Sequence, residues 1–345
     1  MTLPATTRQY QLTKAGSYKN LQIKEVPVNP PKPHDVLVKV HAVSLQYRDL
    51  LVASGTYLAP CADQVIPCSD MAGEVIALGE GVQDWKIGDR VCANFSTDHI
   101  YGDSTFAIQQ TSLGGQAHGV LTQYRTFPAH SLVKVPEHYS YEEASTLPCA
   151  ALTAYNALHG PTPVKAGDYV LVLGTGGVSI WGLQIAVAAG AIVIATSSSD
   201  EKLAIATKLG AKHVINYNKT PNWDQEILKI TNGAGVDHVI EVGGQGTLSR
   251  SLNSARVGGS VHVIGFVSQD KNNFEMVMII GKAIALRGVL IGSVAQFRDM
   301  NRLIAANPEK TRPVIDKVFS FDKALDAYAH LESQKHVGKV VIKVA

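Results

Sequence analysis

Residues 169–200 read YVLVLGTGGVSIWGLQIAVAAGAIVIATSSSD, and this stretch decides the fold. An apolar run ends at Leu173, a glycine-rich turn follows, and residues 180–189 have the composition of a packed helix. A second apolar run then ends in three serines. The order of strand, glycine turn, helix and strand predicts the start of a parallel sheet that helices cover on both faces.

The same alternation continues along the chain. Strand-like runs recur at 213–217 (HVINY), 238–243 (HVIEVG), 260–266 (SVHVIGF) and 285–293 (ALRGVLIGS), with helical segments between them. Six strands joined by short crossovers predict an α/β fold with a Rossmann-type doubly wound parallel sheet.

The residues before 130 follow a different pattern. They alternate with period 2 and contain many Gly, Pro and Asp turns, which predicts a mostly β, barrel-like domain. The chain after 295 ends in a helix and a strand that we expect to return to this domain. The predicted domains are therefore 1–130 with 295–345, and 131–294.

The composition limits the partners. The chain has 345 residues, 31 Lys+Arg against 29 Asp+Glu, a net charge of +2 and no basic block. We therefore expect no nucleic-acid partner and no membrane partner. The four cysteines form no CxxC pair and the first sixteen residues contain no apolar signal segment, so we expect a cytoplasmic protein.

The glycine turn carries the strongest functional signal. Gly174 permits a tight turn, Gly176 allows backbone N–H groups to approach a pyrophosphate, and Ser179 stands where a third glycine is common. Thr175, Gly177 and Val178 complete the loop. A plain glycine turn is the alternative, but six alternating strands favour a dinucleotide site.

The end of the second strand bears on the choice of coenzyme. An acidic residue there would bind a ribose 2′-hydroxyl, whereas this chain has Ser197 and Ser198 with Lys202 nearby. Hydroxyls and an ammonium suit a 2′-phosphate, so we predict NADPH/NADP+ rather than NADH. The same segment also predicts a helix N-cap at Ser199 or Asp200.

Several further motifs resemble those of the medium-chain dehydrogenase/reductase superfamily, in particular its zinc-independent quinone oxidoreductase-like and enoyl reductase-like branches. They are residues 44–49 (SLQYRD), 54–57 (SGTY), 70–75 (DMAGEV), 86–91 (KIGDRV), 147–155 (LPCAALTAY), 208–211 (KLGA) and 336–341 (HVGKVV). The resemblance covers essentially the whole chain. It implies a GroES-like catalytic domain beside the Rossmann domain, and a homodimer paired along residues 288–291.

The resemblance also implies where zinc would bind. Zinc-containing relatives are expected to carry Cys at the position of Gln46, His at that of Ser69 and often Cys at that of Cys149. One thiol with an amide and a hydroxyl is a poor zinc site, so we predict no metal. Cys149 then serves as a small packing residue at the start of a helix.

Other site residues are carried over from the same resemblance. Asp49 is implied to be a buried acid that pairs with Lys339 or another base. The implied coenzyme contacts are Tyr47 and Lys339 at the pyrophosphate, Thr153 and Val178 at the nicotinamide, Val242 and Gly243 on the adenosine side, Ile264, Gly265 and Phe266 along the nicotinamide amide, and Gly292 and Ser293 closing the site. Val178, Ile264 and Phe266 would equally suit plain sheet core.

A hydride acceptor that needs no metal must spread the developing charge itself, as a quinone or an α,β-unsaturated carbonyl does. We therefore predict hydride transfer to such a small molecule, with Tyr47, Gln46, Ser69 and Tyr57 as candidate hydrogen-bond donors. We expect the long segment 94–119 to shape the substrate entrance, with His99, His118 and His130 exposed to solvent. A zinc-free alcohol dehydrogenase or ketone reductase, and a dinucleotide-binding structural or regulatory protein with little turnover, remain alternatives.

Overall fold

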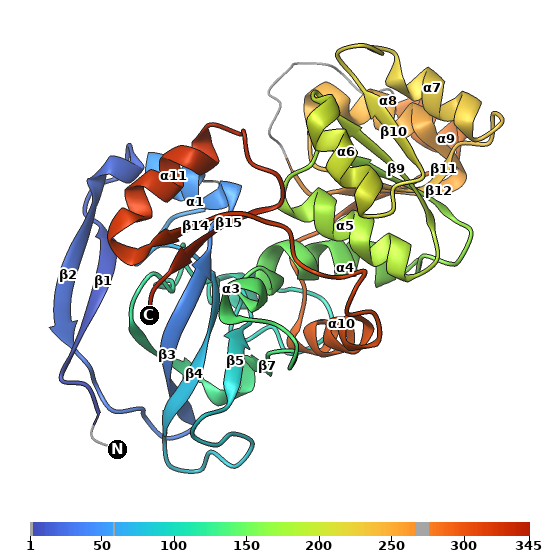
Figure 1. The fold of residues 1–345 in the computed structure, drawn as a ribbon. Helices are drawn as coiled ribbons and strands as arrows, with labels where there is room; N and C mark the ends of the chain where they lie inside the picture. Colours follow the sequence, from blue (N-terminus) through green and yellow to red (C-terminus); the bar gives the residue numbers. More distant parts are fainter. Residues whose placement is uncertain (1–2, 58, 266–275) are drawn as a thin grey trace. The chain divides into compact units, whose positions relative to one another are not determined.

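The computed structural model describes residues 3–57, 59–265 and 276–345. The chain forms two compact units (Figure 1). Unit 1 comprises Met1–Leu152, Gly292–Ala305 and Ile315–Ala345, and unit 2 comprises Thr153–Ile291 and Ala306–Val314. The first boundary falls at Leu152 rather than at residue 130, because β7 (Leu132–Lys134) pairs with β5 (Arg90–Ala93) and α3 (Tyr141–Ala144) packs on β3 (Asp35–Ser44).

Unit 1 is built around a seven-stranded sheet. Its order is β14 (Ile315–Ser320), β15 (Lys339–Lys343), β3, β4 (Asp70–Leu78), β5 and β7, with β6 (Tyr124–Pro128) also paired to β3. A separate antiparallel pair is formed by β1 (Thr6–Leu12) and β2 (Leu21–Pro27). This mostly β unit confirms the GroES-like domain expected from the sequence.

The C-terminal segment returns to unit 1, as expected. Strand β15 pairs antiparallel with β3, so Val341 lies opposite Ser44. Helix α11 (Ala324–Glu332) packs on β14 and β15 and also contacts α1 (Tyr47–Ser54), as Figure 1 shows. Strand β14 precedes this helix and was not expected. The core beneath contains Val38, Val40 and Phe127, all fully buried.

Unit 2 is a six-stranded parallel sheet in the order β10-β9-β8-β11-β12-β13. The strands are β8 (Tyr169–Leu173), β9 (Ile192–Ser197), β10 (His213–Asn216), β11 (Val236–Glu241), β12 (Ala255–Val263) and β13 (Ala285–Gly288). In chain order this is 3-2-1-4-5-6, the arrangement of a dinucleotide-binding sheet, and it confirms the predicted Rossmann fold.

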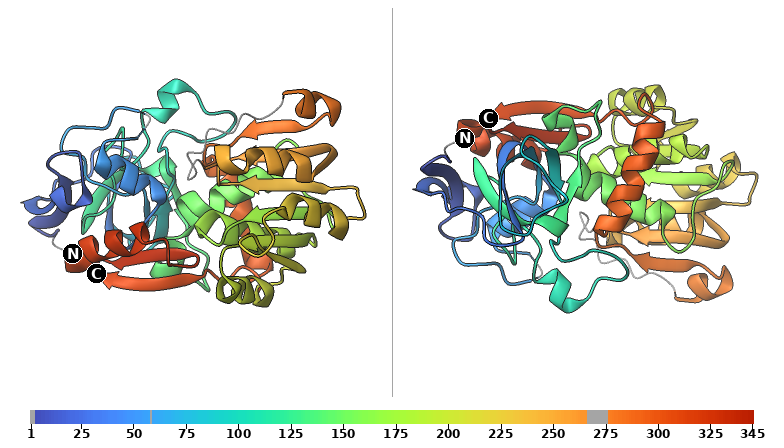
Figure 2. Two further views of the ribbon diagram at one scale, coloured as in Figure 1. Left: turned by 90° about the horizontal axis from the view of Figure 1, so that it is seen from above. Right: turned by 90° about the horizontal axis from the view of Figure 1, so that it is seen from below.

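Helices cover both faces of this sheet (Figure 2). Helix α5 (Gly177–Ala188) packs on β8 and β9, and α6 (Asp200–Lys208) packs on β9 and β10. Helices α7 (Trp223–Ile230) and α8 (Gln245–Ser254) contact each other, and α8 packs on β11 and β12. Helices α4 (Leu152–His159) and α9 (Met276–Gly281) complete the unit. The central strand β8 is mostly buried between these layers, whereas the edge strand β13 is largely exposed.

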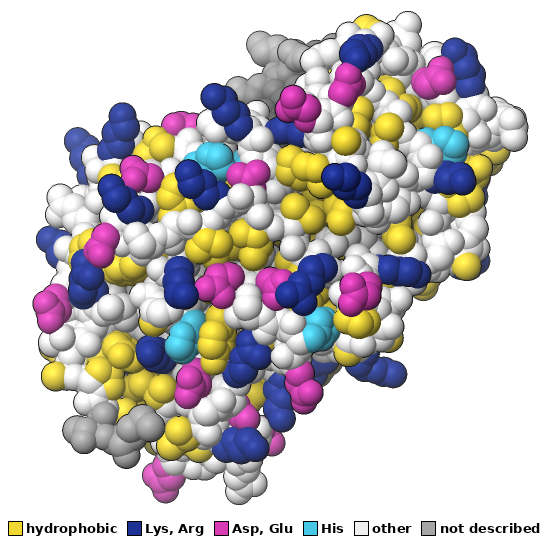
Figure 3. All heavy atoms as spheres, viewed as in Figure 1, with side chains coloured by type: hydrophobic (Ala, Val, Ile, Leu, Met, Phe, Trp, Pro, Cys, Tyr) yellow, Lys and Arg dark blue, Asp and Glu magenta, His cyan; other side chains and the backbone are white. Residues whose placement is uncertain are grey.

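The surface agrees with the balanced composition. On the face shown in Figure 3, basic and acidic side chains are interspersed, and neither sign forms a continuous field. Within residues 3–57, 59–265 and 276–345, no helix has both the length and the apolar content needed to cross a bilayer.

Candidate functional site

The turn after β8 has the backbone that the glycines predict. Gly174 has φ of +73°, a conformation that glycine adopts without strain. Gly176 has φ of −74° and is the N-cap of α5, and a Cβ added to it would meet no atom within 4 Å. Ser179 is buried and its hydroxyl donates to the carbonyl of Leu173 at 2.6 Å. This bond fixes the helix start against the strand end, in the place where a third glycine is common.

These residues fit a bound pyrophosphate. The first N–H groups of a helix have no partner inside the helix, and Gly176 has no side chain with which to cap them. The open space over Gly176 lets an anion approach those N–H groups and the positive end of the helix dipole. Gly177 and Val178 form the first turn of α5 and are partly exposed, whereas Thr175 is buried.

The end of β9 forms the serine turn that the sequence singled out. Ser199 is the N-cap of α6 and its hydroxyl accepts from the Lys202 N–H at 3.5 Å, which confirms the predicted cap. Ser197 is buried and accepts from the Ser199 N–H at 3.5 Å, whereas Ser198 is exposed. Capping and the proposed phosphate contacts therefore involve the same short turn.

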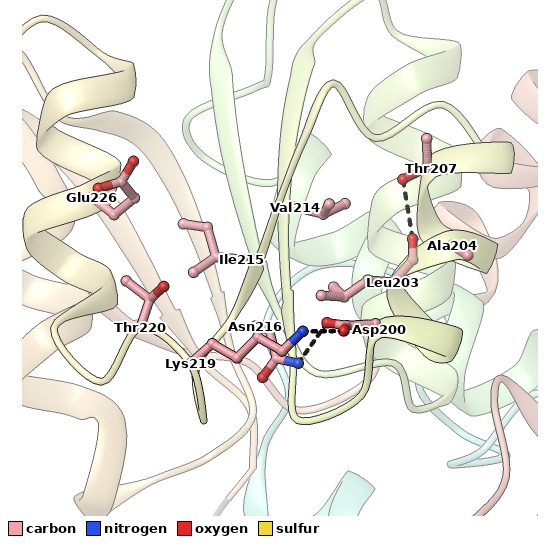
Figure 4. A pocket seen from close by; sticks show the side chains of 10 residues that line it. All are labelled: Asp200, Leu203, Ala204, Thr207, Val214, Ile215, Asn216, Lys219, Thr220 and Glu226. Carbon is pink, nitrogen blue, oxygen red and sulfur yellow. Dashed lines mark hydrogen bonds and ion pairs between the residues drawn. The ribbon is translucent and has the colours of Figure 1, made fainter.

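The side chain of Asp200, the first residue of α6, has two partners, one at the end of β10 and one just after it. Its carboxylate accepts from Asn216 Nδ2 at 2.7 Å and forms an ion pair with Lys219. Figure 4 shows both side chains converging on Asp200 at the rim of a groove of about 510 Å³ between α6 and β10. The hydrogen bonds from Asn216 and Lys219 lower the pKa of Asp200. Its negative charge is thus balanced locally.

Glu241, at the end of β11, is a positioning residue that the sequence reasoning missed. It is fully buried, and one carboxylate oxygen accepts from the N–H groups of Gly243 at 2.7 Å and Gly244 at 2.9 Å and from the Thr247 hydroxyl at 2.7 Å. The other oxygen accepts from the Ser251 hydroxyl. The carboxylate therefore fixes the loop that contains Val242 and Gly243.

Most of the predicted coenzyme contacts lie together at the carboxyl ends of the parallel strands. The carboxyl ends of β8, β9, β11 and β12 place the glycine turn, the serine turn, Val242 with Gly243, and Ile264 with Gly265 side by side. The last pair is fixed because both N–H groups donate to the Glu241 carbonyl, at 2.9 and 3.2 Å. Phe266 lies outside the described residues.

Thr153, at the start of α4, is buried. Its hydroxyl has no hydrogen-bond partner within the described part of the chain, which leaves it available to a bound polar group.

Unit 1 contains a second polar cluster, centred on Asp70. This carboxylate is fully buried and accepts from the Ser69 hydroxyl at 2.6 Å, from Gln46 Nε2 and from the Cys149 N–H at 3.1 Å. Burial raises the pKa of Asp70, while the charge of Lys339 and these hydrogen bonds act in the opposite direction. Asp70 was visible in the sequence only as part of a motif, because nothing local identifies it as the acceptor that organises two predicted donors.

Asp49 and Lys339 are both buried, but the expected ion pair between them is not formed. Asp49 accepts the Gln46 N–H at 2.7 Å at the start of α1, and Lys339 Nζ donates to the Leu45 carbonyl. Asp49 bonds locally because its carboxylate lies three residues after the Gln46 N–H, the spacing of a helix cap. Burial raises the pKa of Asp49 to about 7 and lowers that of Lys339.

The residues at the expected zinc position do not fit a zinc ion. Gln46 and Ser69 direct their donors at Asp70, and burial raises the pKa of the Cys149 thiol. Zinc needs deprotonated thiolate, imidazole or carboxylate ligands, and a neutral thiol with an amide and a hydroxyl supplies none. Cys149 packs in a π-helical turn, Leu147–Ala151, as its predicted structural role requires.

The two candidate tyrosines lie in different surroundings. Tyr47 begins α1 and is 39% exposed, with no hydrogen-bond partner among the residues described. Tyr57 lies against the Arg48 guanidinium, whose carbon is 4.6 Å from its ring centre and 4.7 Å from that of Phe95. Tyr47 is therefore the freer donor, and Tyr57 packs around a cation.

Gly292 and Ser293 lie where residues 292–305 join unit 1. The carbonyl of Gly292 accepts from Asn94 Nδ2 at 3.3 Å. Ser293 is buried and its hydroxyl accepts from the Gln296 N–H at 3.2 Å, so it caps α10 (Val294–Ala306).

Segment 94–119 is more ordered than a loop, since it contains the helix α2 (Phe106–Gln109). The expectation that its histidines face solvent is correct for His118 and His130 and wrong for His99. His99 is buried because its ring bonds the Gly102 carbonyl at 2.9 Å and its own carbonyl accepts from Val294.

Comparison with known proteins agrees with this geometry. Residues 32–137 match the family "Alcohol dehydrogenase GroES-like domain", and residues 177–306 match "Zinc-binding dehydrogenase". A zinc-type alcohol dehydrogenase-like protein of Schizosaccharomyces pombe is 48% identical over 90% of this chain and 91% of its own. Human quinone oxidoreductase is 29% identical over 97% of both chains, and acryloyl-coenzyme A reductase of Metallosphaera sedula is 29% identical over 95% and 97%.

Solved structures show the same architecture. An NAD-dependent alcohol dehydrogenase superposes with a TM-score of 0.89 at 28% identity and covers 98% of this chain and 100% of its own. The 2-octenoyl-CoA carboxylase reductase CinF, in complex with NADP and 2-octenoyl-CoA, gives 0.85 at 25% identity and covers 99% and 88%. Fold, motifs and relatives agree, and the chain belongs to the medium-chain dehydrogenase/reductase superfamily of oxidoreductases.

Proposed function

We propose that this oxidoreductase uses NADPH to reduce a quinone or an α,β-unsaturated carbonyl without zinc. The observation that carries the proposal is the Asp70 cluster, in which Gln46 and Ser69 hydrogen-bond to a carboxylate and are not arranged as metal ligands. An acceptor reduced without a Lewis acid must delocalise its own charge. The related human enzyme is named for quinones, and the Metallosphaera enzyme and CinF for conjugated thioesters.

The residues divide the work between binding and orientation. Residues 174–178 would hold the pyrophosphate, and Ser197, Ser198 and Lys202 the 2′-phosphate. When bound, the reduced nicotinamide supplies the hydride. Tyr47 is the donor that we assign to the substrate oxygen, since its hydroxyl is not engaged by the described protein groups, whereas Ser69 donates to Asp70.

Steady-state oxidation of NADPH with a quinone, an enone and a simple ketone tests the proposal. We expect turnover with the first two substrates and little with the ketone. Turnover confined to the ketone would instead support a zinc-free ketone reductase. Coenzyme binding by calorimetry without any turnover would support a binding protein. Metal analysis is the parallel test, because stoichiometric zinc in the active protein would contradict the zinc-free mechanism.

The preference for NADPH has a separate test. Lys202→Ala should raise the dissociation constant of NADPH about tenfold and leave that of NADH nearly unchanged, since one charge-assisted contact is lost. Lys229→Ala is the control, because Lys229 lies in the same unit and forms an ion pair with Glu226 at 3.1 Å. Equal weakening of both coenzymes would remove Lys202 from the phosphate site.

We also propose a cytosolic homodimer. Strand β13 lies at an edge of the parallel sheet, and Leu286 and Leu290 are 37% and 48% exposed. Exposed apolar edges favour pairing with another copy. Leu290→Asp should shift sedimentation toward a monomer, and an unchanged dimer would place the interface elsewhere. The cytosolic assignment rests on the four cysteines, which are all unpaired.

A further inference from the structure

Unit 1 contains a cavity that the proposed coenzyme site does not use. Its volume is about 590 Å³, and it lies between β1, the end of β2, β6 and the segments around Ile66 and His118. Sixteen residues line it, and none of them is Asp or Glu. Among the described residues that line it, Arg125 is the only charged side chain and His118 is the only histidine.

Arg125 has no acidic partner. It is partly buried on β6, its Nε is fully buried, and this atom has no hydrogen-bond partner within the described chain. No ion pair joins Arg125 to any of the carboxylates described, and the centre of the Phe127 ring lies 5.3 Å from the guanidinium carbon. Burial alone lowers its pKa to about 10. Because a half-buried cation without a counter-charge is poorly solvated, an anion beside Arg125 is favoured.

His118 adds a second donor to the same cavity. Its Nδ1 accepts the Ile66 N–H at 3.3 Å, so the neutral ring carries its proton on Nε2. Burial lowers the pKa of His118, the charge of Arg125 lowers it further, and Asp63 acts in the opposite direction. A neutral imidazole that donates from Nε2 complements a guanidinium in binding an oxyanion.

The remaining lining defines the rest of the ligand. Val26, Val28, Leu37 and Ile66 give the cavity an apolar wall, and its volume is that of a small-molecule site. The groove beside α6 is a useful contrast, because there Lys219 is already paired with Asp200. Of these two sites, only the unit 1 cavity has a cation, Arg125, that forms no ion pair with a described carboxylate.

We propose that this cavity binds a small organic oxyanion, a carboxylate or a phosphate monoester with an apolar body, through Arg125 and His118. The apolar wall and the charged end select for amphipathic ligands over inorganic ions. Anion binding at Arg125 and His118 requires neither the coenzyme nor the proposed reaction.

Calorimetry with hexanoate, phenyl phosphate and inorganic phosphate tests the proposal on the full-length protein. We expect one of the organic anions to bind at least about tenfold more tightly than inorganic phosphate, and the better of the two identifies the headgroup. In NMR spectra the same anion should raise the pKa of His118, because it introduces a negative charge beside the ring. No binding of either organic anion to the wild-type protein at 10 mM would overturn the proposal.

Variants locate the site. Arg125→Gln should weaken binding about tenfold or more and abolish the shift at His118. Arg8→Gln is the matched control, because Arg8 lies on β1 and forms an ion pair with Asp322 but does not line the cavity. If Arg125→Gln fails to fold, His118→Gln and Arg125→Lys test the site instead, and we expect each to weaken anion binding in part. Binding that survives all three changes, or an anion that leaves the His118 resonance unmoved, would refute the assignment.

Discussion

Gly176→Ala provides the sharpest test of the coenzyme site, because it separates binding from folding. The backbone of Gly176, at φ −74°, is open to alanine, and the added Cβ would meet no protein atom within 4 Å. The same Cβ would occupy the space through which a pyrophosphate reaches the N–H groups of α5. Loss of one hydrogen bond to a charged oxygen costs about 1.5–3 kcal/mol, which corresponds to a rise of about 10- to 150-fold in the dissociation constant.

Gly174→Ala is the matched comparison. Its Cβ would also meet no atom, but φ of +73° strains any residue with a side chain by about 1–2 kcal/mol. We expect this variant to lower the melting temperature by several degrees, at about 2–4 °C per kcal/mol, and Gly176→Ala to leave it nearly unchanged. Calorimetric titration with NADPH and thermal unfolding measure the two effects. A Gly176→Ala protein that binds both coenzymes like the wild type would refute the phosphate-loop reasoning.

Three further outcomes follow from the polar contacts. Glu241→Ala should lower the melting temperature and weaken coenzyme binding, because the N–H groups of Gly243 and Gly244 lose their acceptor. Glu241→Gln keeps an acceptor oxygen and should restore most of both properties. Equal defects in the two variants would argue against the positioning role. Folding raises the pKa of Asp49 from 3.8 to about 7, so the unfolded chain loses this proton at lower pH and the free energy of unfolding falls as pH rises from about 4 to 7. Asp49→Asn should reduce this pH dependence, measured by urea unfolding at a series of pH values. An unchanged pH dependence would mean that other groups cause it. Lys219→Ala should weaken the binding of NADPH more than that of NADH, because the charge of Asp200 is then no longer balanced by Lys219. Adding Asp200→Asn to this variant should restore NADPH binding. If the double variant binds NADPH as weakly as Lys219→Ala, the charge of Asp200 is not the cause.

The elements that local pattern predicted best are those of unit 2. Six strand-like runs with short crossovers predicted the doubly wound parallel sheet, and a hydroxyl at a strand-to-helix turn predicted the Ser199 cap. The strand order itself is known only from the structure. The boundary near residue 130 was placed too early because β7 and α3 resemble connecting segments in the sequence, and only their pairing with unit 1 assigns them.

The site residues divide in the same way. Gly174 and Gly176 shape the turn through their own backbone, so a short motif is enough to predict its conformation. Gln46 and Ser69 could be named as polar candidates, but their common acceptor lies 24 residues from Gln46, and its other donor is the N–H of Cys149. His99 was expected in solvent because nothing in its neighbours along the chain shows that α10 covers it.

The sequence by itself determined the class of the fold and the glycine turn after β8, because a strand, a turn and the next helix are each encoded by residues close together in the chain. Only the tertiary structure decided which charges are compensated: Asp70 by three donors, Asp200 by Lys219, and Arg125 by no acid within the described chain. The physical reason is that the free energy of a buried charge depends on partners that the fold brings together from distant segments.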